Sequence, residues 1–398
     1  MKFIKSIYTE STLPVVLIMI AAPLGVIFEY GMSFSNAQTV ALFLSLLLII
    51  LQLTSSIYHN RLILAPYTLV SLFFIVIYAL LSYIVVDGQG GGIKATAEII
   101  VLSVMFYYWY QQKNINITLT YKAIYAVAIL NIIYIATFLS ERVEVVNYLR
   151  YTYIIPIVVI YGIVLASRMR RTAISVLVVS FSIYILSLFG GRYPIVFSLL
   201  VVFIYPMYVL KLKYRLLLAF ICLTLIYDSS YYIPALEYIE EMSWYSRILY
   251  LDEGIGTGRM SLYTTYFDNF NDFILTGYGA GQTGIELYGN YESYPHNVYL
   301  HMVSEYGILG IMLALVSMYQ VIVSILIYLK VKKLCHQYGD TDNIIILDTF
   351  FIILLYVLFL FMKSASMYDM YPLIGITIAL YHASVKLQKH FLKKSIKT

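Results

Sequence analysis

Residues 307–330 read GILGIMLALVSMYQVIVSILIYLK, an apolar run with no charged side chain before Lys330. About 20 helical residues cross the hydrocarbon core of a bilayer, so the run has the length of a membrane-spanning helix. Backbone polar groups in lipid need internal partners, and this restricts spanning segments to helices or closed barrels. Barrel strands are short and alternate apolar with polar residues, unlike this run. The stretch therefore predicts a transmembrane helix.

The rest of the chain has the same character. It is 61% hydrophobic and 12% charged, with a mean hydropathy of +0.83. That is more apolar surface than a soluble core of 398 residues can hide. We therefore predict an all-α polytopic membrane protein with about 12 transmembrane helices. The predicted spans are 12–30, 38–54, 64–85, 96–110, 119–139, 151–167, 172–190, 193–210, 216–234, 307–330, 344–363 and 371–387.

The basic residues report membrane topology. Lys and Arg occur in short clusters between apolar runs and not along one soluble face, so the net charge of +5 does not indicate a nucleic-acid partner. With the N-terminus in the cytoplasm, 19 of the 26 basic residues fall on the inner side, and both termini are cytoplasmic. The opening lysines Lys2 and Lys5, followed by an apolar run, fit either a signal peptide or a first span; we favour an uncleaved span.

One long polar segment, residues 235–295, interrupts the short turns between spans. It holds nine acidic and two basic residues, a formal charge of −7. A loop of this length is usually functional or disordered, and its many aromatic residues argue against disorder. The chain is thus predicted to comprise 1–234 with transmembrane helices one to nine, an extracytoplasmic loop over 235–295, and 296–398 with helices ten to twelve and a basic cytoplasmic tail.

Arg192 is the first candidate for chemistry. It lies in Phe189-Gly190-Gly191-Arg192-Tyr193-Pro194, the tightest predicted outer turn, where glycines let the backbone turn closely. A guanidinium at that depth, with five donors, suits phosphate or pyrophosphate oxygens. The alternative is an arginine that only extends to the membrane interface. Because arginine on the outer side runs against the inside bias, we favour the functional interpretation.

Two glycine-rich runs lie in the outer loop. In Gly254-Ile255-Gly256-Thr257-Gly258-Arg259, backbone amides and Arg259 can approach an anion, although a salt bridge with a neighbouring acidic residue is an equal alternative. The second run, 277–284, contains a formal G-x-G-x-x-G pattern. No βαβ unit surrounds it, so we predict a flexible turn and no dinucleotide site.

His296 lies where the loop meets the next apolar segment, in Tyr294-Pro295-His296-Asn297. We expect Pro295 to start that helix. An imidazole there can act as a general base or orient a hydroxyl, or it can simply cap the helix. His301 would lie about 140° further round the helix, so the two do not form a metal-binding pair. Glu305 shares a face with His301, and we predict a structural pair. No spacing of Cys, His or Asp indicates a metal site or cofactor.

Several of these motifs follow one another in a specific order. They are Gly191-Arg192, Gly258-Arg259, Leu275-Thr276-Gly277-Tyr278-Gly279, and His296-Asn297 followed by Glu305, Gly307 and Gly310. This order resembles the O-antigen ligase and polymerase family, called Wzy-like, which makes bacterial surface polysaccharides. The resemblance is strongest over 187–310. The sequence departs from the family pattern at Tyr263, where many members have Trp.

The resemblance implies a metal-independent glycosyltransferase with a GT-C-like helical fold in the bacterial inner membrane. Such enzymes transfer a glycan from an undecaprenyl pyrophosphate carrier, on the outer face, to an acceptor hydroxyl. By motif, Arg192 and Arg259 would hold the pyrophosphate, His296 would be the base or orienting group, and Asn297 would support it. Gly191, Gly258 and Glu305 would support the site. A chain-length regulator and a flippase are the partners this implies, besides membrane lipid.

We predict a polymerase of lipid-linked repeat units for O-antigen, capsule or exopolysaccharide. A ligase of the same family, which passes the glycan to lipid A core or another acceptor, is the first alternative. A lipid-linked oligosaccharide flippase is an alternative from another class. It would place charges along a pathway inside the spans, whereas here charge collects in one outer loop.

Overall fold

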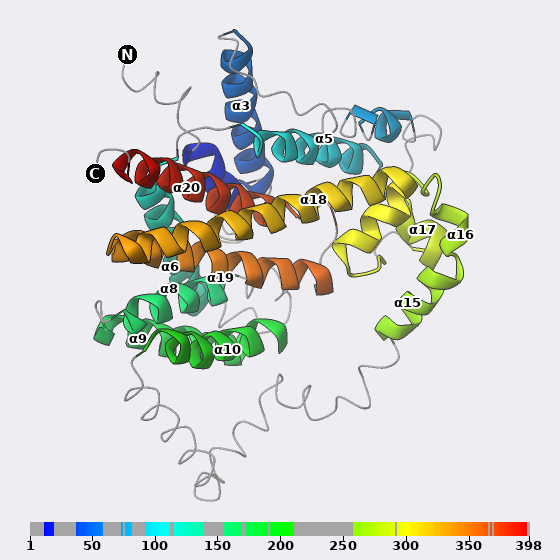
Figure 1. Ribbon diagram of the computed structural model, residues 1–398. Helices are drawn as coiled ribbons and strands as arrows, with labels where there is room; N and C mark the ends of the chain where they lie inside the picture. Colours follow the sequence, from blue (N-terminus) through cyan, green and yellow to red (C-terminus); the bar gives the residue numbers. More distant parts are fainter. Residues whose placement is uncertain are drawn as a thin grey trace, which may run out of the picture. The chain divides into compact units, whose positions relative to one another are not determined.

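The protein is all-helical in the part of the chain that the computed structural model describes. These residues are 12–19, 37–58, 73–74, 76–81, 92–111, 115–138, 154–168, 172–189, 192–210, 258–290, 293–364, 367 and 370–395. Within them no residue lies in a strand (Figure 1), which confirms the predicted fold class at the level of secondary structure.

Helices occur where the apolar runs predict them. Each predicted span contains helical residues, except 216–234, which lies outside the described residues. Two of the described helices, Val298–Gln337 and Thr341–Lys363, are long and apolar enough to cross a membrane. The helix bounds are α3 Ala37–Tyr58, α5 Gly92–Tyr108, α6 Ile117–Phe138, α8 Ile155–Ser167, α9 Thr172–Phe189, α10 Arg192–Val209, α15 Gly258–Asp268, α16 Phe270–Phe273, α17 Thr283–Tyr288, α18 Val298–Gln337, α19 Thr341–Ser364 and α20 Tyr371–Ser395.

The chain divides into two compact units. One comprises Met1–Ala21, Thr39–Tyr121 and Gly256–Thr398, and the other comprises Ala22–Gln38 and Lys122–Ile255. In the second unit α8, α9 and α10 pack against one another. A Cβ at Gly162 of α8 would lie 2.5 Å from Val179 Cγ2 of α9, so the two helices approach closely at this glycine.

In the first unit α18, α19 and α20 pack pairwise and run side by side (Figure 1). Polar side chains inside this bundle satisfy backbone carbonyls at the end of α5. Gln320 Nε2 donates to the Phe106 carbonyl at 2.9 Å, and His382 Nε2 to the Trp109 carbonyl at 3.2 Å. Such bonds replace the water that a bilayer withholds from a helix end.

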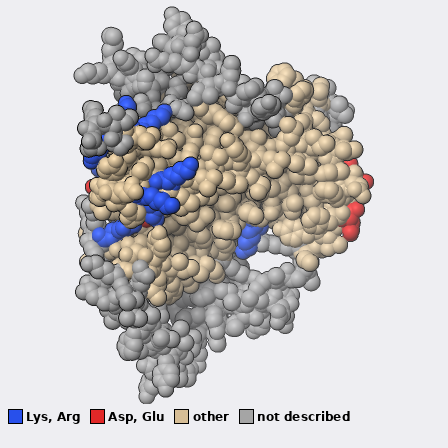
Figure 2. Space-filling model, in the orientation of Figure 1, with Lys and Arg blue, Asp and Glu red and all other residues tan. Residues whose placement is uncertain are grey.

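Charge is unevenly distributed along the α18–α20 bundle, although Asp340 and Asp342 lie at its lysine-rich end and Lys363 lies in the last turn of α19. Lysines gather at the C-terminal ends of α18 and α20, whereas the acidic side chains of the 258–290 segment lie at the opposite end (Figure 2). Among the lysines, Lys332 Nζ lies 2.7 Å from Asp348 Oδ1, and this carboxylate also accepts a 2.7 Å bond from Tyr328. The buried Asp348 is therefore paired and hydrogen-bonded, as a charge removed from water must be.

Helix α18 begins earlier than the predicted span that starts at 307. It starts at Val298 and changes direction at Gly307, where φ is 54° and ψ is −128°. The residues before the kink include His301, Ser304 and Glu305. Because these residues are polar, the hydropathy pattern did not predict this helical segment. The predicted start coincides with the kink and not with the helix terminus.

Gly307 offers a test of the kink. A Cβ there would lie 2.5 Å from the Leu275 carbonyl oxygen, on a backbone conformation that is open mainly to glycine. We expect Gly307→Ala to destabilise the folded protein by about 2–5 kcal/mol, the sum of backbone strain and overpacking. Gly289→Ala is the matched control, since φ is +72° there but nothing lies within 4 Å of the added carbon. Equal thermal unfolding shifts for the two variants would contradict this account.

Candidate active site

The 258–290 segment folds onto the first turns of α18. Tyr266, Phe273 and Leu287 form a buried cluster, against which Leu300 and Val303 of α18 pack. The Tyr266 hydroxyl donates to the Leu300 carbonyl at 3.0 Å, which joins α15 to α18. Burial raises the pKa of this phenol, so it stays a donor at physiological pH. The segment is thus a packed cap on the N-terminal end of α18.

The glycine-rich run 277–284 inserts at the kink of α18. The amide of Tyr278 donates to the Ser304 carbonyl at 2.8 Å, and the amide of Gly279 to the Glu305 carbonyl at 3.0 Å. The kink at Gly307 makes these two carbonyls available, because the regular i→i−4 ladder is interrupted there. The predicted turn is present, and these backbone bonds hold it against α18. The sequence shows the glycine-rich run, but not which carbonyls accept hydrogen bonds from its amides.

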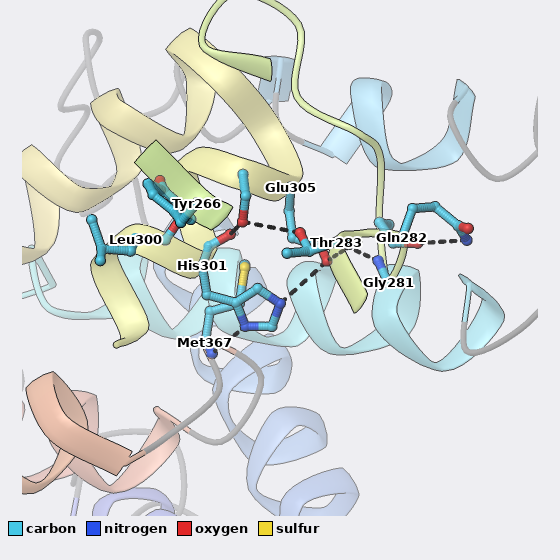
Figure 3. A network of polar contacts seen from close by, with 10 residues as sticks. Tyr266, Gly281, Gln282, Thr283, Leu300, His301, Glu305 and Met367 are labelled. Carbon is cyan, nitrogen blue, oxygen red and sulfur yellow. Dashed lines mark hydrogen bonds and ion pairs between the residues drawn. The ribbon is translucent and has the colours of Figure 1, made fainter. Parts of the chain in front are cut away.

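Glu305 organises the same run from inside (Figure 3). Its side chain is 1% exposed. One carboxylate oxygen accepts from the Thr283 amide and from His301 Nε2, each at 3.2 Å, and the other accepts from the Gly281 amide. In each of these three bonds the carboxylate accepts from an N–H donor. The predicted pair with His301 is confirmed.

His301 is held from both edges of its ring (Figure 3). Its Nδ1 accepts a 3.2 Å bond from the Met367 backbone amide, while Nε2 faces Glu305. A nitrogen that accepts carries no proton, so the ring proton resides on Nε2 and points at the carboxylate. The imidazole therefore links the glycine-rich run to the connection between α19 and α20.

His296 lies just before α18, in an unusual backbone conformation. Its φ is +51°, the only positive value among the described residues other than glycine. The helix begins at Val298 with Asn297 as its N-cap, so the prediction that Pro295 starts the helix is wrong. Asn297 is extended, with φ −138°, and its side chain caps the helix better than a proline two residues earlier would. His301 therefore lies in α18, whereas His296 lies before it.

Asn297 fixes the backbone directly after His296. Its side-chain oxygen accepts from the amides of Tyr299 at 3.0 Å and Leu300 at 3.2 Å. Its amide nitrogen donates to the Met362 carbonyl, near the C-terminal end of α19, at 2.9 Å. One side chain thus caps α18 and ties it to α19. That Asn297 supports His296 stays a prediction; these bonds hold the backbone that follows His296.

Tyr294 stands between the two histidines. Its ring centroid lies 4.3 Å from that of His296 and 5.7 Å from that of His301, and with His301 it is stacked at an interplanar angle of 21°. The contacts run from His296 through Tyr294 to His301 and Glu305. Sequence reasoning missed this role, since Tyr294 is one of 42 tyrosines and no spacing distinguishes it.

The arginines occupy helix N-termini in different units. Arg192 is the first residue of α10, and Arg259 is the second residue of α15, directly after Gly258. Gly191 and the side chains of both arginines lie outside what the structure describes. The residues brought together around the start of α18 are thus Tyr294, His296, Asn297, His301 and Glu305. In the described parts, no three His, Cys, Asp or Glu side chains cluster as metal ligands would.

Comparison with known families now bears on this site. Residues 148–315 match a family model described as O-antigen ligase. Over this segment the chain is similar to the O-antigen ligase family. The segment spans both arginines, the capping segment and the start of α18 with His296 and Glu305, which confirms the resemblance inferred from motif order. Among curated proteins, none matches the chain.

The match indicates the class of proteins to which this segment is similar. Members of the O-antigen ligase family are glycosyltransferase-like enzymes, ligases or polymerases, whose substrates are lipid-linked glycans. The two long apolar helices, suited by length and composition to cross a membrane, and the matched family together point to an integral membrane protein and to polysaccharide biosynthesis.

Proposed function

We propose that this protein is a metal-independent polymerase that joins undecaprenyl-pyrophosphate-linked oligosaccharide repeat units into O-antigen, capsule or exopolysaccharide. The observation that carries the proposal is His296. A partly exposed imidazole sits on a positive-φ backbone, between a stacked tyrosine and a helix cap, in the segment that matches this family. A side chain whose backbone and ring are both constrained is preorganised for chemistry.

The proposed reaction needs few protein groups. An acceptor sugar hydroxyl attacks C1 of the donor glycan, the bond from C1 to the phosphate oxygen breaks, and the pyrophosphate leaves with the bonding electrons. His296 takes the hydroxyl proton as general base. Arg192 and Arg259 bind the pyrophosphate and stabilise its developing charge, so that alignment and charge stabilisation supply most of the acceleration. Gly191 and Gly258 allow the backbone to come close to the anion.

We propose the topology that the sequence predicts. We place about 12 spans in a GT-C-like arrangement within the bacterial inner membrane, with both termini cytoplasmic and the 235–295 loop outside. The lysines at one end of the α18–α20 bundle and the acidic cap at the other support this orientation. A flippase that delivers the lipid-linked unit and a chain-length regulator are the proposed partners.

A ligase is the second candidate, and the description of the matching family as O-antigen ligase favours it. The chemistry is the same, but the acceptor is then lipid A core or another surface molecule and not a lipid-linked repeat unit. The family match also weighs against the flippase alternative, because a flippase breaks no glycosidic phosphate bond.

Reconstitution separates these possibilities. The purified protein in lipid vesicles is given a lipid-linked repeat unit, alone or with lipid A core, and products are resolved by chain length. A polymerase yields a ladder without core, whereas a ligase forms product only with it. We expect Arg192→Ala and Arg259→Ala to lower either activity by about 100-fold or more. Folded arginine variants with wild-type turnover would refute the site, and inactivity with both acceptors would refute the function.

A further inference from the structure

The O-antigen ligase match and the motif order give no role to His301, Tyr294 or the Met367 amide. Yet these groups form a continuous set of contacts that ends at His296. His301 is 7% exposed in its side chain, so substrate does not reach it freely. Its contribution to the reaction must pass through its neighbours.

The orientation of His301 is set before substrate binds. Bonds at both ring nitrogens, one from the Met367 amide and one to Glu305, fix the plane of the ring as well as its tautomer. Glu305 is itself held by the amides of Gly281 and Thr283. The ring therefore cannot turn without breaking bonds in a buried network.

The face of this fixed ring contacts Tyr294. The two rings are nearly parallel, at 21° with centroids 5.7 Å apart, so a change in the plane of His301 would alter this contact. The Tyr294 ring in turn contacts His296 at 4.3 Å, tilted by 51°. Asn297 holds the backbone on the other side of His296. The Tyr294 ring and the backbone held by Asn297 thus both restrict the position of the His296 imidazole.

We propose that His301, kept in its Nε2-protonated form by Met367 and Glu305, is a positioning residue that orients the catalytic His296 through the ring of Tyr294. The inference rests on the proposed function, because it takes His296 as the base. It predicts that His301 and Tyr294 affect the chemical step and not substrate capture, and that neither acts without the other.

A double-mutant cycle tests the coupling. In the reconstituted full-length protein, His301→Ala and Tyr294→Leu should each lower kcat by about 10- to 100-fold, with KM changed by less than about threefold. The double variant should be no worse than the poorer single variant. Unchanged kcat in His301→Ala, or losses that multiply in the double variant, would overturn the proposal.

Conservative variants separate positioning from folding. Tyr294→Phe keeps the ring and should retain near wild-type kcat. His301→Gln restores an acceptor and a donor at similar positions and should recover part of the loss. His390→Ala, which removes an exposed histidine from α20, is the matched control and should change nothing. If Tyr294→Phe is as impaired as Tyr294→Leu in the folded state, the ring contact is not the cause and the proposal fails.

A spectroscopic measurement tests the positioning of His296 separately from the proposed function. In protein labelled at the histidine rings, the His296 resonance is identified by its loss in His296→Asn. It should shift in His301→Ala, and the same change should have no further effect in a Tyr294→Leu background. A shift with a fully active His296→Asn would refute the catalytic assignment while leaving the positioning contact intact. No shift, with His296→Asn inactive, would refute the positioning alone.

Discussion

His296→Asn is expected to lower glycan transfer by about 100- to 10,000-fold, the range that a general base contributes. Asparagine is the sharp replacement because it tolerates positive φ better than other side chains without a ring, so the backbone at +51° is retained. Only the imidazole is removed. The measurement is the initial rate of glycan transfer from a lipid-linked repeat unit, at saturating donor.

The comparison variants for His296 make the result interpretable. His296→Ala adds backbone strain to the loss of the imidazole, so it should be less stable than His296→Asn but no more active. His390→Ala controls for the loss of any histidine. Turnover within about threefold of wild type in folded His296→Asn would remove His296 from the chemistry, since general-base loss costs at least about 100-fold.

The positions of several helices could be predicted from the sequence because the lipid environment constrains the backbone. An apolar run long enough to cross the bilayer has to satisfy its own backbone, so hydropathy alone located the described parts of α3, α9, α19 and α20. The rule failed for α18, whose first turns are polar. There the helix continues to Val298 because Asn297 caps it and the 258–290 segment covers it, which are tertiary effects.

The candidate site was predicted only as a set of residue types. His296 stood out by its place at the end of a polar loop, and the pair of His301 with Glu305 followed from helical spacing. The role of the 277–284 run could not be predicted, since its amides donate hydrogen bonds to carbonyls that are available only because α18 is kinked at Gly307. Nor did the stack at Tyr294, because a contact between aromatic rings leaves no period in the sequence.

Glu305→Ala is expected to release the glycine-rich run from α18. The change removes a buried acceptor from the amides of Gly281 and Thr283 and from His301. Each buried donor left without a partner costs about 1–3 kcal/mol, so this end of the domain loses several bonds at once. Hydrogen exchange of the amides in 277–284 should quicken by about 10- to 100-fold, as about 1.4–3 kcal/mol of lost protection implies.

The matched variants distinguish the charge of Glu305 from its bulk. Glu305→Gln keeps the shape of the side chain, but its NH₂ group faces at least one of the three N–H donors, so at least one hydrogen bond is lost. The rate of amide exchange in 277–284 should therefore lie between those of wild type and Glu305→Ala. Glu286→Gln, at an exposed carboxylate in α17 of the same segment, should leave exchange unchanged. Because the run and His301 share this acceptor, faster exchange should accompany lower kcat across the three variants. Exchange that stays slow in Glu305→Ala would mean that the backbone bonds to Ser304 and Glu305 hold the run by themselves, and that the carboxylate acts on His301 only.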